Sequence, residues 1–196
     1  MTIDAPVTAS NFTSAADATV SSSSATATPD APSVRPRVVL IAMAGANRVI
    51  GDGTDQPWHL REDQRRFAQL TRGHPMVMGR ATFDTFTKPL PGRPHVVVTR
   101  DRGWSAPGRP DVHVAHDPHE ALQLAATLPG GAERIAVIGG GQIYAALLDA
   151  ADAVELTEVD AEAPGDVLFP ELPESEWRQA GRDDRCAFAY VTYERR

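Results

Sequence analysis

Short runs of apolar residues alternate along the chain with stretches of helical periodicity. The apolar runs are continuous and β-branched, which is typical of strands buried on both faces of a sheet. We predict these strands at 37–44, 74–78, 95–99, 112–115, 133–138 and 153–159. Between them we predict helices at about 60–70, 80–86, 117–128 and 142–149, followed by a hairpin at 177–181 and 185–194.

This alternation defines the fold class. Apolar strands joined by helices pair in parallel, with the helices covering both faces of the sheet. The closing hairpin adds an antiparallel edge. The sequence therefore predicts an α/β domain with three layers, α/β/α, around a mostly parallel mixed sheet.

The first 36 residues differ from this pattern. They are rich in Ala, Ser, Thr and Pro, and such a composition buries too little apolar surface to offset the entropy of ordering. We therefore expect a disordered extension at 1–36 and a folded domain at 37–196. The extension lacks the basic start and apolar core of a secretory signal. A dispensable tail is the favoured interpretation, and a docking segment is the alternative.

Composition excludes several classes of protein. The net charge of −7 and the pI near 5.3 are unlike those of a nucleic-acid-binding protein. A single cysteine, Cys186, excludes an internal disulfide and favours a reducing compartment. No apolar run reaches the length of a membrane span. We expect a cytoplasmic protein that binds neither nucleic acid nor membrane.

One predicted helix carries an acid on its apolar side. The stripe, spaced i, i+3, i+7 and i+10, consists of Leu60, Asp63, Phe67 and Leu70. An acid in the first turn can serve the helix dipole, or it can pair with Arg66. If Asp63 is buried beside Trp58 and Phe67 instead, desolvation raises its pKa. An acid tuned in this way can bind an NH-rich ring and help to deliver a proton.

Two junctions pass from strand through glycine to helix, Met78-Gly79-Arg80 and Ile138-Gly139-Gly140-Gly141-Gln142. Glycine lets the backbone approach a phosphate closely, and a helix N-terminus favours its negative charge. Arg80 and Arg100 each follow a strand and can hold an extra phosphate, which indicates a phosphorylated dinucleotide. Neither junction matches G-x-G-x-x-G, so a tight turn with solvated arginines is the alternative.

A metal site and a serine nucleophile are not expected. His113, His116 and His119 are three residues apart, but Pro118 and the change from strand to helix break any common face. No G-x-S-x-G occurs in the chain.

The motifs occur in the order and spacing of a known family, and the chain resembles dihydrofolate reductases over about 37–196. The matching residues are Val49-Ile50-Gly51, Pro57-Trp58, Asp63, Phe67, Thr71, Val77-Met78-Gly79-Arg80, Thr82-Phe83, Leu90-Pro91-Gly92-Arg93, Ile138-Gly139-Gly140-Gly141, Tyr144, Leu156-Thr157, Gly165-Asp166 and Phe169-Pro170.

The resemblance implies NADPH-dependent reduction of 7,8-dihydrofolate to tetrahydrofolate, with hydride transfer to C6 and a proton reaching N5, in support of one-carbon metabolism. It implies a catalytic group of Asp63, Trp58 and Thr157, in which Asp63 and Thr157 bind the pterin and Trp58 holds a water. The implied substrate residues are Ile41, Ala42, Asp63, Gln64, Phe67, Phe86, Lys88, Leu90, Arg93 and Thr157, with Arg93 on the glutamate α-carboxylate. Antifolates are implied as ligands, and we expect a monomer.

The resemblance also implies a cofactor site. Met43 and Ile50 would flank the nicotinamide, and the loop 51–56 would be a mobile lid. The full implied set is Met43, Val49, Ile50, Gly51, Asp52, Gly53, Thr54, Asp55, Gly79, Arg80, Ala81, Thr82, Thr99, Arg100, Gly139, Gly140, Gly141, Gln142, Ile143 and Tyr144.

Four positions depart from the family's usual pattern. Gln56 stands where an apolar residue is usual, and Arg61 stands where Pro is common. Phe83 stands where Trp is frequent. Gln142 stands where some members have Arg, so a preference for NADPH over NADH would depend on Arg80 and Arg100. Two alternatives remain open: a pyrimidine reductase of flavin synthesis with the same fold, and a pterin- or NADPH-binding module without catalysis.

Overall fold

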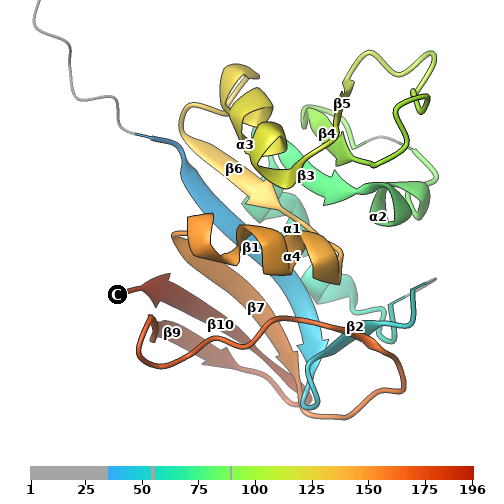
Figure 1. Cartoon of the computed structure of the whole chain (residues 1–196). Helices are drawn as coiled ribbons and strands as arrows, with labels where there is room; N and C mark the ends of the chain where they lie inside the picture. Colours follow the sequence, from blue (N-terminus) through green and yellow to red (C-terminus); the bar gives the residue numbers. More distant parts are fainter. Residues whose placement is uncertain (1–34, 54–55, 89) are drawn as a thin grey trace, which may run out of the picture. The chain divides into compact units, whose positions relative to one another are not determined.

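The strand predicted at 37–44 is β1 (Arg37–Gly45), which runs through the middle of the sheet (Figure 1). The computed structural model describes residues 35–53, 56–88 and 90–196. The other strands are β2 (Val49–Gly51), β3 (Met76–Gly79), β4 (His95–Val98), β5 (Val112–Ala115), β6 (Arg134–Val137), β7 (Ala153–Val159), β8 (Val167–Leu168), β9 (Trp177–Asp184) and β10 (Phe188–Arg195). The helices are α1 (Arg61–Thr71), α2 (Arg80–Asp84), α3 (Pro118–Thr127) and α4 (Gly141–Leu147), with a 3-10 turn η1 (Leu148–Ala150).

The main sheet has the strand order β5-β4-β3-β6-β1-β7-β10-β9. Neighbouring strands from β5 to β7 pair in parallel, and β10 runs antiparallel to both β7 and β9. The prediction of a mostly parallel mixed sheet closed by an antiparallel hairpin is confirmed. Because the parallel strands share one direction, their carboxyl ends meet at one edge of the sheet.

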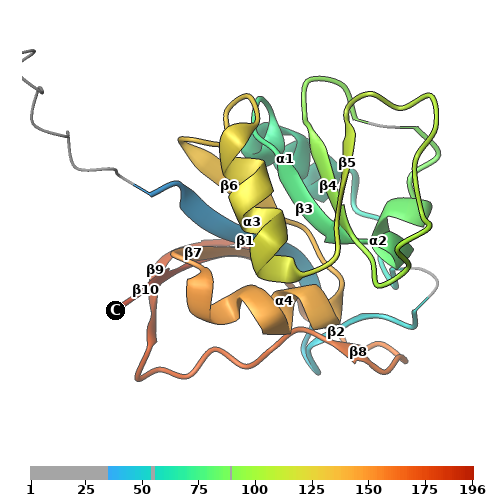
Figure 2. The same cartoon turned by 45° about the horizontal axis from the view of Figure 1, so that its top comes forward.

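Successive residues of β1 point to opposite faces of the sheet and enter two different cores. Val38 and Leu40 pack with residues of α3 and α4 on one face. Val39 and Ile41 pack on the other face with residues of α1 and α2. Figure 2 shows α3 and α4 in front of the sheet and α1 behind it. The predicted three layers are therefore confirmed.

The prediction missed one small sheet and misjudged the hairpin. β2 and β8 pair antiparallel in a separate sheet, and strands this short give no readable periodicity. β9 continues to Asp184, although all of its residues after Trp177 are exposed. An edge strand made of polar and charged side chains lacks the apolar alternation that predicts strands. β10 begins at Phe188 rather than at 185.

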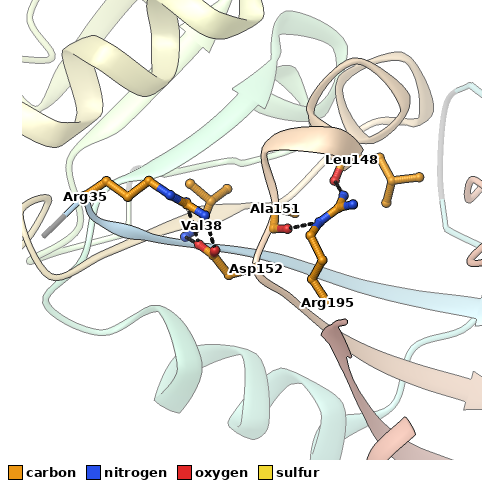
Figure 3. Close-up of polar contacts among 6 residues, drawn as sticks. All are labelled: Arg35, Val38, Leu148, Ala151, Asp152 and Arg195. Atoms are coloured by element: carbon orange, nitrogen blue, oxygen red, sulfur yellow. Dashed lines mark hydrogen bonds and ion pairs between the residues drawn. The ribbon is translucent and has the colours of Figure 1, made fainter. Parts of the chain in front are cut away.

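Side chains hold the ends of several elements. Asp117 caps α3 by accepting bonds from the N–H groups of His119 and Glu120. Arg195 of β10 reaches back to the end of the α4–η1 segment, where it donates to the carbonyl oxygens of Leu148 and Ala151 at 2.6 and 2.9 Å (Figure 3).

The start of β1 is held by Asp152, which immediately precedes β7. The Asp152 carboxylate accepts the backbone N–H of Val38 at 2.8 Å and forms a two-bond ion pair with Arg35 (Figure 3). The extension expected at 1–36 lies outside the described residues except for Arg35 and Pro36. Among the helices that the structure describes, none has the length and apolarity needed to cross a membrane.

Candidate active site

Asp63 faces the sheet from the first turn of α1 and meets Thr157 on β7. The Thr157 hydroxyl donates a hydrogen bond of 2.5 Å to the Asp63 carboxylate, and the Thr157 side chain is fully buried. Glu62, Arg65 and Gln69 are exposed on the side of the helix opposite the stripe. The acid within the apolar stripe therefore has a specific polar partner on the sheet.

Of the local alternatives for Asp63, its place in the first turn of α1 suits the helix dipole, whereas the ion pair with Arg66 does not describe this geometry. α1 begins after Leu60, and no side chain caps it there. Arg66, the partner considered at i+3, forms its ion pair with Glu155 on β7 at 2.6 Å. The Asp63 carboxylate turns instead toward Thr157.

Burial raises the pKa of the Asp63 carboxyl above its ordinary value of 3.8. The hydrogen bond from Thr157 and the positive charge of Arg66 act in the opposite direction, but they are the smaller effects. The raised pKa that the stripe predicted is confirmed in direction. A carboxyl poised in this way exchanges a proton closer to neutral pH than an exposed Asp does.

Trp58 lies beside the end of β1, where Gly45 leaves room for it. A Cβ on Gly45 would lie 2.4 Å from the Cη2 atom of Trp58, so no side chain fits there without displacing the indole. Trp58 packs on the small apolar cluster of Met43, Val159 and Phe188. The indole is thereby held at the carboxyl end of the central strand.

Most of the apolar residues implied for the substrate pocket share one face of the sheet. The core on the α1 side contains Ile41, with Phe67, Phe86 and Leu90 packed against it. Ala42 packs with the core on the opposite face, as its position next to Ile41 on the strand requires. Gln64 and Lys88 are exposed.

Arg93 is held at the C-terminal end of α1. Its guanidinium donates to the buried hydroxyl of Thr71 at 3.3 Å, and its Nε donates to the carbonyl oxygen of Pro91 at 3.3 Å. The Thr71 hydroxyl in turn donates to the carbonyl oxygen of Phe67 at 2.7 Å. This chain of bonds fixes a positive charge near the apolar residues of that face.

The two strand–glycine–helix junctions come together. The N–H of Gly79 donates to the carbonyl oxygen of Gly139 at 2.8 Å, so α2 and α4 begin side by side. A Cβ on Gly140 would lie 3.5 Å from the Thr82 hydroxyl. No side chain caps either helix at its first turn, which leaves backbone N–H groups for an anion.

Within the second junction, Gly139 has a φ of 114° and is joined to Gly140 by a cis peptide bond. A Cβ there would lie 3.2 Å from the ring of Tyr144, so glycine is required both by φ and by space. The buried Tyr144 hydroxyl donates to the carbonyl oxygen of Ile41 at 2.5 Å. Burial raises the pKa of Tyr144, and the nearby Asp63 charge adds to this effect. Tyr144, which packs on Gly139, therefore lies close to Asp63, so the second glycine junction and the acid border the same part of the sheet.

The remaining implied cofactor residues lie around this region. Arg80 forms an exposed ion pair with Asp101 at 3.3 Å, and Arg100 is exposed. Thr99 is buried, and its hydroxyl accepts the N–H of Asp101. Ala81 and Gln142 are exposed, whereas Ile143 is buried in the core.

The segment implied as a lid begins in β2. Val49, Ile50 and Gly51 are buried, and β2 pairs with β8. Asp52 and Gly53 are exposed, and Thr54 and Asp55 lie outside the described residues. A Cβ on Gly165 would lie 2.5 Å from the carbonyl oxygen of Gly51, so the segment before β8 packs tightly on β2.

Sequence reasoning missed three residues that shape the site: Gly45, His95 and Glu155. His95 is fully buried, and its Nε2 accepts the N–H of Leu90 at 3.3 Å. A histidine opening an apolar strand was the available signal for His95, and a glycine ending a buried strand was the signal for Gly45. Glu155 has no local signal, because its partner Arg66 is 89 residues away.

The three histidines considered as metal ligands have separate environments. His116 Nδ1 lies 2.8 Å from the carbonyl oxygen of Thr99, and the backbone of His119 serves the cap of α3. In the parts of the chain with described coordinates, no three His, Cys, Asp or Glu side chains gather as metal ligands would.

Comparison with known proteins gives one family. The family model of dihydrofolate reductase matches residues 37–195. The chain is 39% identical to the dihydrofolate reductase HdrB of Haloferax volcanii over 82% of this chain and 84% of that protein. It is 41% identical to the dihydrofolate reductase type 3 of Salmonella typhimurium, over 81% of this chain and 98% of that protein. It is 43% identical to the dihydrofolate reductase of Mycobacterium tuberculosis, over 72% of this chain and 84% of that protein.

The fold and the site, taken with these comparisons, define an oxidoreductase that uses a nicotinamide cofactor and acts on a small molecule. Both the matched range and the level of identity place the chain within one family. The chain belongs to the dihydrofolate reductase family.

Proposed function

We propose that this chain catalyses the NADPH-dependent reduction of 7,8-dihydrofolate to 5,6,7,8-tetrahydrofolate. The observation that carries the proposal is the Asp63–Thr157 pair on the apolar face of α1. A half-buried acid with one hydroxyl partner has acceptor capacity left for the N–H groups of a pterin. An ion pair with Arg66 does not account for this acid, since Arg66 is paired with Glu155.

The residues around Asp63 orient the substrate. Asp63 and Thr157 bind the ring N–H and the 2-amino group, and Trp58 holds a water beside the ring. Ile41, Phe67 and Phe86 form apolar walls that exclude other water from the pterin. Arg93, already fixed by Thr71, binds the α-carboxylate of the glutamate.

Proton delivery to N5 falls to the same acid. With its pKa raised by burial, Asp63 retains a proton at a higher pH than an exposed Asp. Activity should therefore fall as the pH rises through the pKa of Asp63. When bound, NADPH supplies the hydride that reaches C6 of dihydrofolate.

The residues at the two glycine junctions fit a dinucleotide. The uncapped first turns of α2 and α4 offer N–H groups to phosphates, and the glycines keep that approach open. Arg80 and Arg100 would hold the 2′-phosphate, with Arg80 exchanging Asp101 for it. An exposed pair of this kind contributes only about 0–1 kcal/mol, so the exchange costs little.

Several wider features belong to the same proposal. We propose a cytoplasmic monomer that binds antifolates in the dihydrofolate pocket. Residues 1–36 are proposed to be dispensable, so a chain beginning at residue 37 should retain full turnover.

Loss of NADPH absorbance in the presence of dihydrofolate tests the proposed function directly. NADH replaces NADPH in a second series, and a large fall in kcat/KM is expected. Tight NADPH binding without turnover would favour the module without catalysis, an alternative motivated by Gln56 and Arg61. The relatives reported above all have names of dihydrofolate reductases, which gives the pyrimidine reductase no support.

A further inference from the structure

A second polar contact joins α1 to β7 beside the Asp63–Thr157 pair. Arg66 lies one helical turn after Asp63, and Glu155 lies two residues before Thr157 on the same face of β7. The guanidinium of Arg66 donates to the Glu155 carboxylate at 2.6 Å. The helix and the strand are thus joined by two parallel contacts, one between an acid and a hydroxyl and the other between opposite charges.

This second contact is held from β10 as well. Thr192 is the register partner of Glu155, and its hydroxyl donates to the same carboxylate at 2.9 Å. Tyr190 is the register partner of Thr157, and its ring lies 4.6 Å below the guanidinium carbon of Arg66. Both members of the ion pair therefore have a second neighbour that fixes their orientation.

Among the ion pairs given above for the described residues, the Arg66–Glu155 pair is the most buried. Its side chains are 17% and 18% exposed, whereas the pair of Arg80 with Asp101 is 44% and 54% exposed. Partial exclusion of water strengthens the field that these charges exert on their neighbours. Removal of one member leaves the other partly buried and unpaired, which alters that field strongly.

We propose that Arg66 and Glu155 are positioning residues for the reaction: their ion pair holds α1 against β7 and sets the electrostatic environment of Asp63. The inference rests on the proposed role of Asp63 in catalysis. Arg66 exerts a positive potential at the Asp63 carboxyl, which favours its carboxylate form, and Glu155, paired with Arg66, offsets part of that potential. The pair thus limits how far Arg66 opposes the effect of burial on Asp63.

The charged and titratable groups facing Asp63 come from several elements. Arg66, on α1 itself, acts directly on Asp63. Glu155, on β7, contacts Arg66 and not Asp63. Burial raises the pKa values of Tyr144 on α4 and Tyr190 on β10, and the nearby Asp63 charge adds to both. Both tyrosines stay neutral around pH 7, so the charge around Asp63 is tested by substitutions at Arg66 and at its partner Glu155.

The test is the dependence of kcat on pH for Arg66→Met and Glu155→Gln. Loss of the positive charge favours protonated Asp63, so the alkaline limb of the Arg66→Met profile should move to higher pH. Loss of the negative charge leaves Arg66 to act on Asp63, so the Glu155→Gln profile should move to lower pH. We expect shifts on the order of half a pH unit in opposite directions.

Three controls accompany these variants. Arg65→Met removes a charge from the exposed face of the same helix and should not move the profile. Arg66→Lys keeps the charge and should restore a profile close to that of the unchanged chain. The double variant Arg66→Met/Glu155→Gln removes both charges and should lie between the single variants, even if Glu155→Gln alone folds poorly.

An Arg66→Met profile that coincides with that of the unchanged chain, at whatever kcat, would overturn the inference and leave a purely structural pair. Failure of the proposed function would look different, because the unchanged chain would then not oxidise NADPH with dihydrofolate at any pH. If only the proposed role of Asp63 failed, Asp63→Asn would keep full turnover, whatever the charge at residues 66 and 155.

Discussion

Asp63 is a residue whose burial works against the stability of the fold. The folded protein binds the Asp63 proton more tightly than the unfolded chain does, because burial raises the pKa of the folded carboxyl above 3.8. Its contribution to stability is therefore full below pH 3.8 and is lost as the pH rises through the raised pKa. At neutral pH the chain keeps an acid that a neutral side chain would replace at a gain in stability, as functional sites often do.

Asp63→Asn should separate activity from stability. We expect turnover to fall by about a hundred-fold or more, because the amide cannot supply the proton. The affinity for NADPH should be nearly unchanged, and resistance to urea at pH 8 should increase. Glu62→Gln, on the exposed neighbour, is the matched control for both measurements. A variant that turned over normally would remove Asp63 from the mechanism.

His95 links stability to pH in the opposite direction. Burial, reinforced by the positive charge of Arg93, lowers the pKa of His95 below 6.5. The neutral ring also accepts the N–H of Leu90, which a protonated ring cannot do. The stabilisation by neutral His95 is complete above pH 6.5 and is lost as the pH falls from there toward the lowered pKa.

Urea unfolding of His95→Asn between pH 7.5 and 5 tests this linkage. Asn keeps an acceptor for Leu90 but does not titrate, so the variant should lose less stability on acidification than the unchanged chain. His113→Asn is the control, since that side chain is less buried. Equal losses for His95→Asn and the unchanged chain would contradict the assignment.

At the scale of elements, β1 ends at Gly45, whose lack of a side chain makes room for the Trp58 indole. Gly45→Ala would bring a methyl group to 2.4 Å from Trp58 and 2.7 Å from the carbonyl oxygen of Ala161. Because one of these atoms belongs to the backbone, the strain cannot be relieved by a rotamer change alone. We expect a loss of about 1–3 kcal/mol in urea unfolding, together with a raised KM for dihydrofolate as the indole is displaced. Gly181→Ala is the control, because the nearest atom to its Cβ is 4.0 Å away.

The α4–η1 segment depends on Arg195 for its C-terminal end. Two carbonyl oxygens there accept bonds from the guanidinium, which also lies over the ring of Trp177. Arg195→Met should cost about 1.5–3 kcal/mol of unfolding free energy, as loss of a charged donor does. Arg178→Met, which breaks only an exposed pair with Glu194, should cost less than about 1 kcal/mol. Comparable losses for the two variants would show that Arg195 does not support the helix end.

The sequence predicted elements best where burial is continuous. β1, β4 and β6 contain no polar side chain after their first residue, and their predicted ranges agree with the structure to within a residue at each end. β2 and β8 were missed because two or three residues carry no period, and their partners are remote in sequence. The site shows the same division. The helical stripe indicated Asp63, whereas Glu155 and Gly45 acquire their significance only from contacts made across the fold.

At the scale of the whole domain, the sheet brings both proposed ligands to one edge. Residues proposed for the pterin lie on the α1 side of β1, and the glycine junction lies between β6 and α4. The Tyr144–Ile41 hydrogen bond connects the two sides through the backbone of β1. The carboxyl ends of parallel strands are the usual place for ligands in open α/β sheets. The central strand thus separates the two proposed sites while forming a wall of each.

The two-bond contact between Arg35 and Asp152 has a practical consequence for immobilising or labelling this protein. It fixes the point where the chain enters the sheet at the amino end of β1. A nine-residue strand spans roughly 30 Å, so that entry point is far from the edge where Trp58 lies. A surface tether or a fluorescent reporter joined just ahead of Arg35 is thus anchored on the side opposite the reacting groups, leaving the approach of small molecules unobstructed.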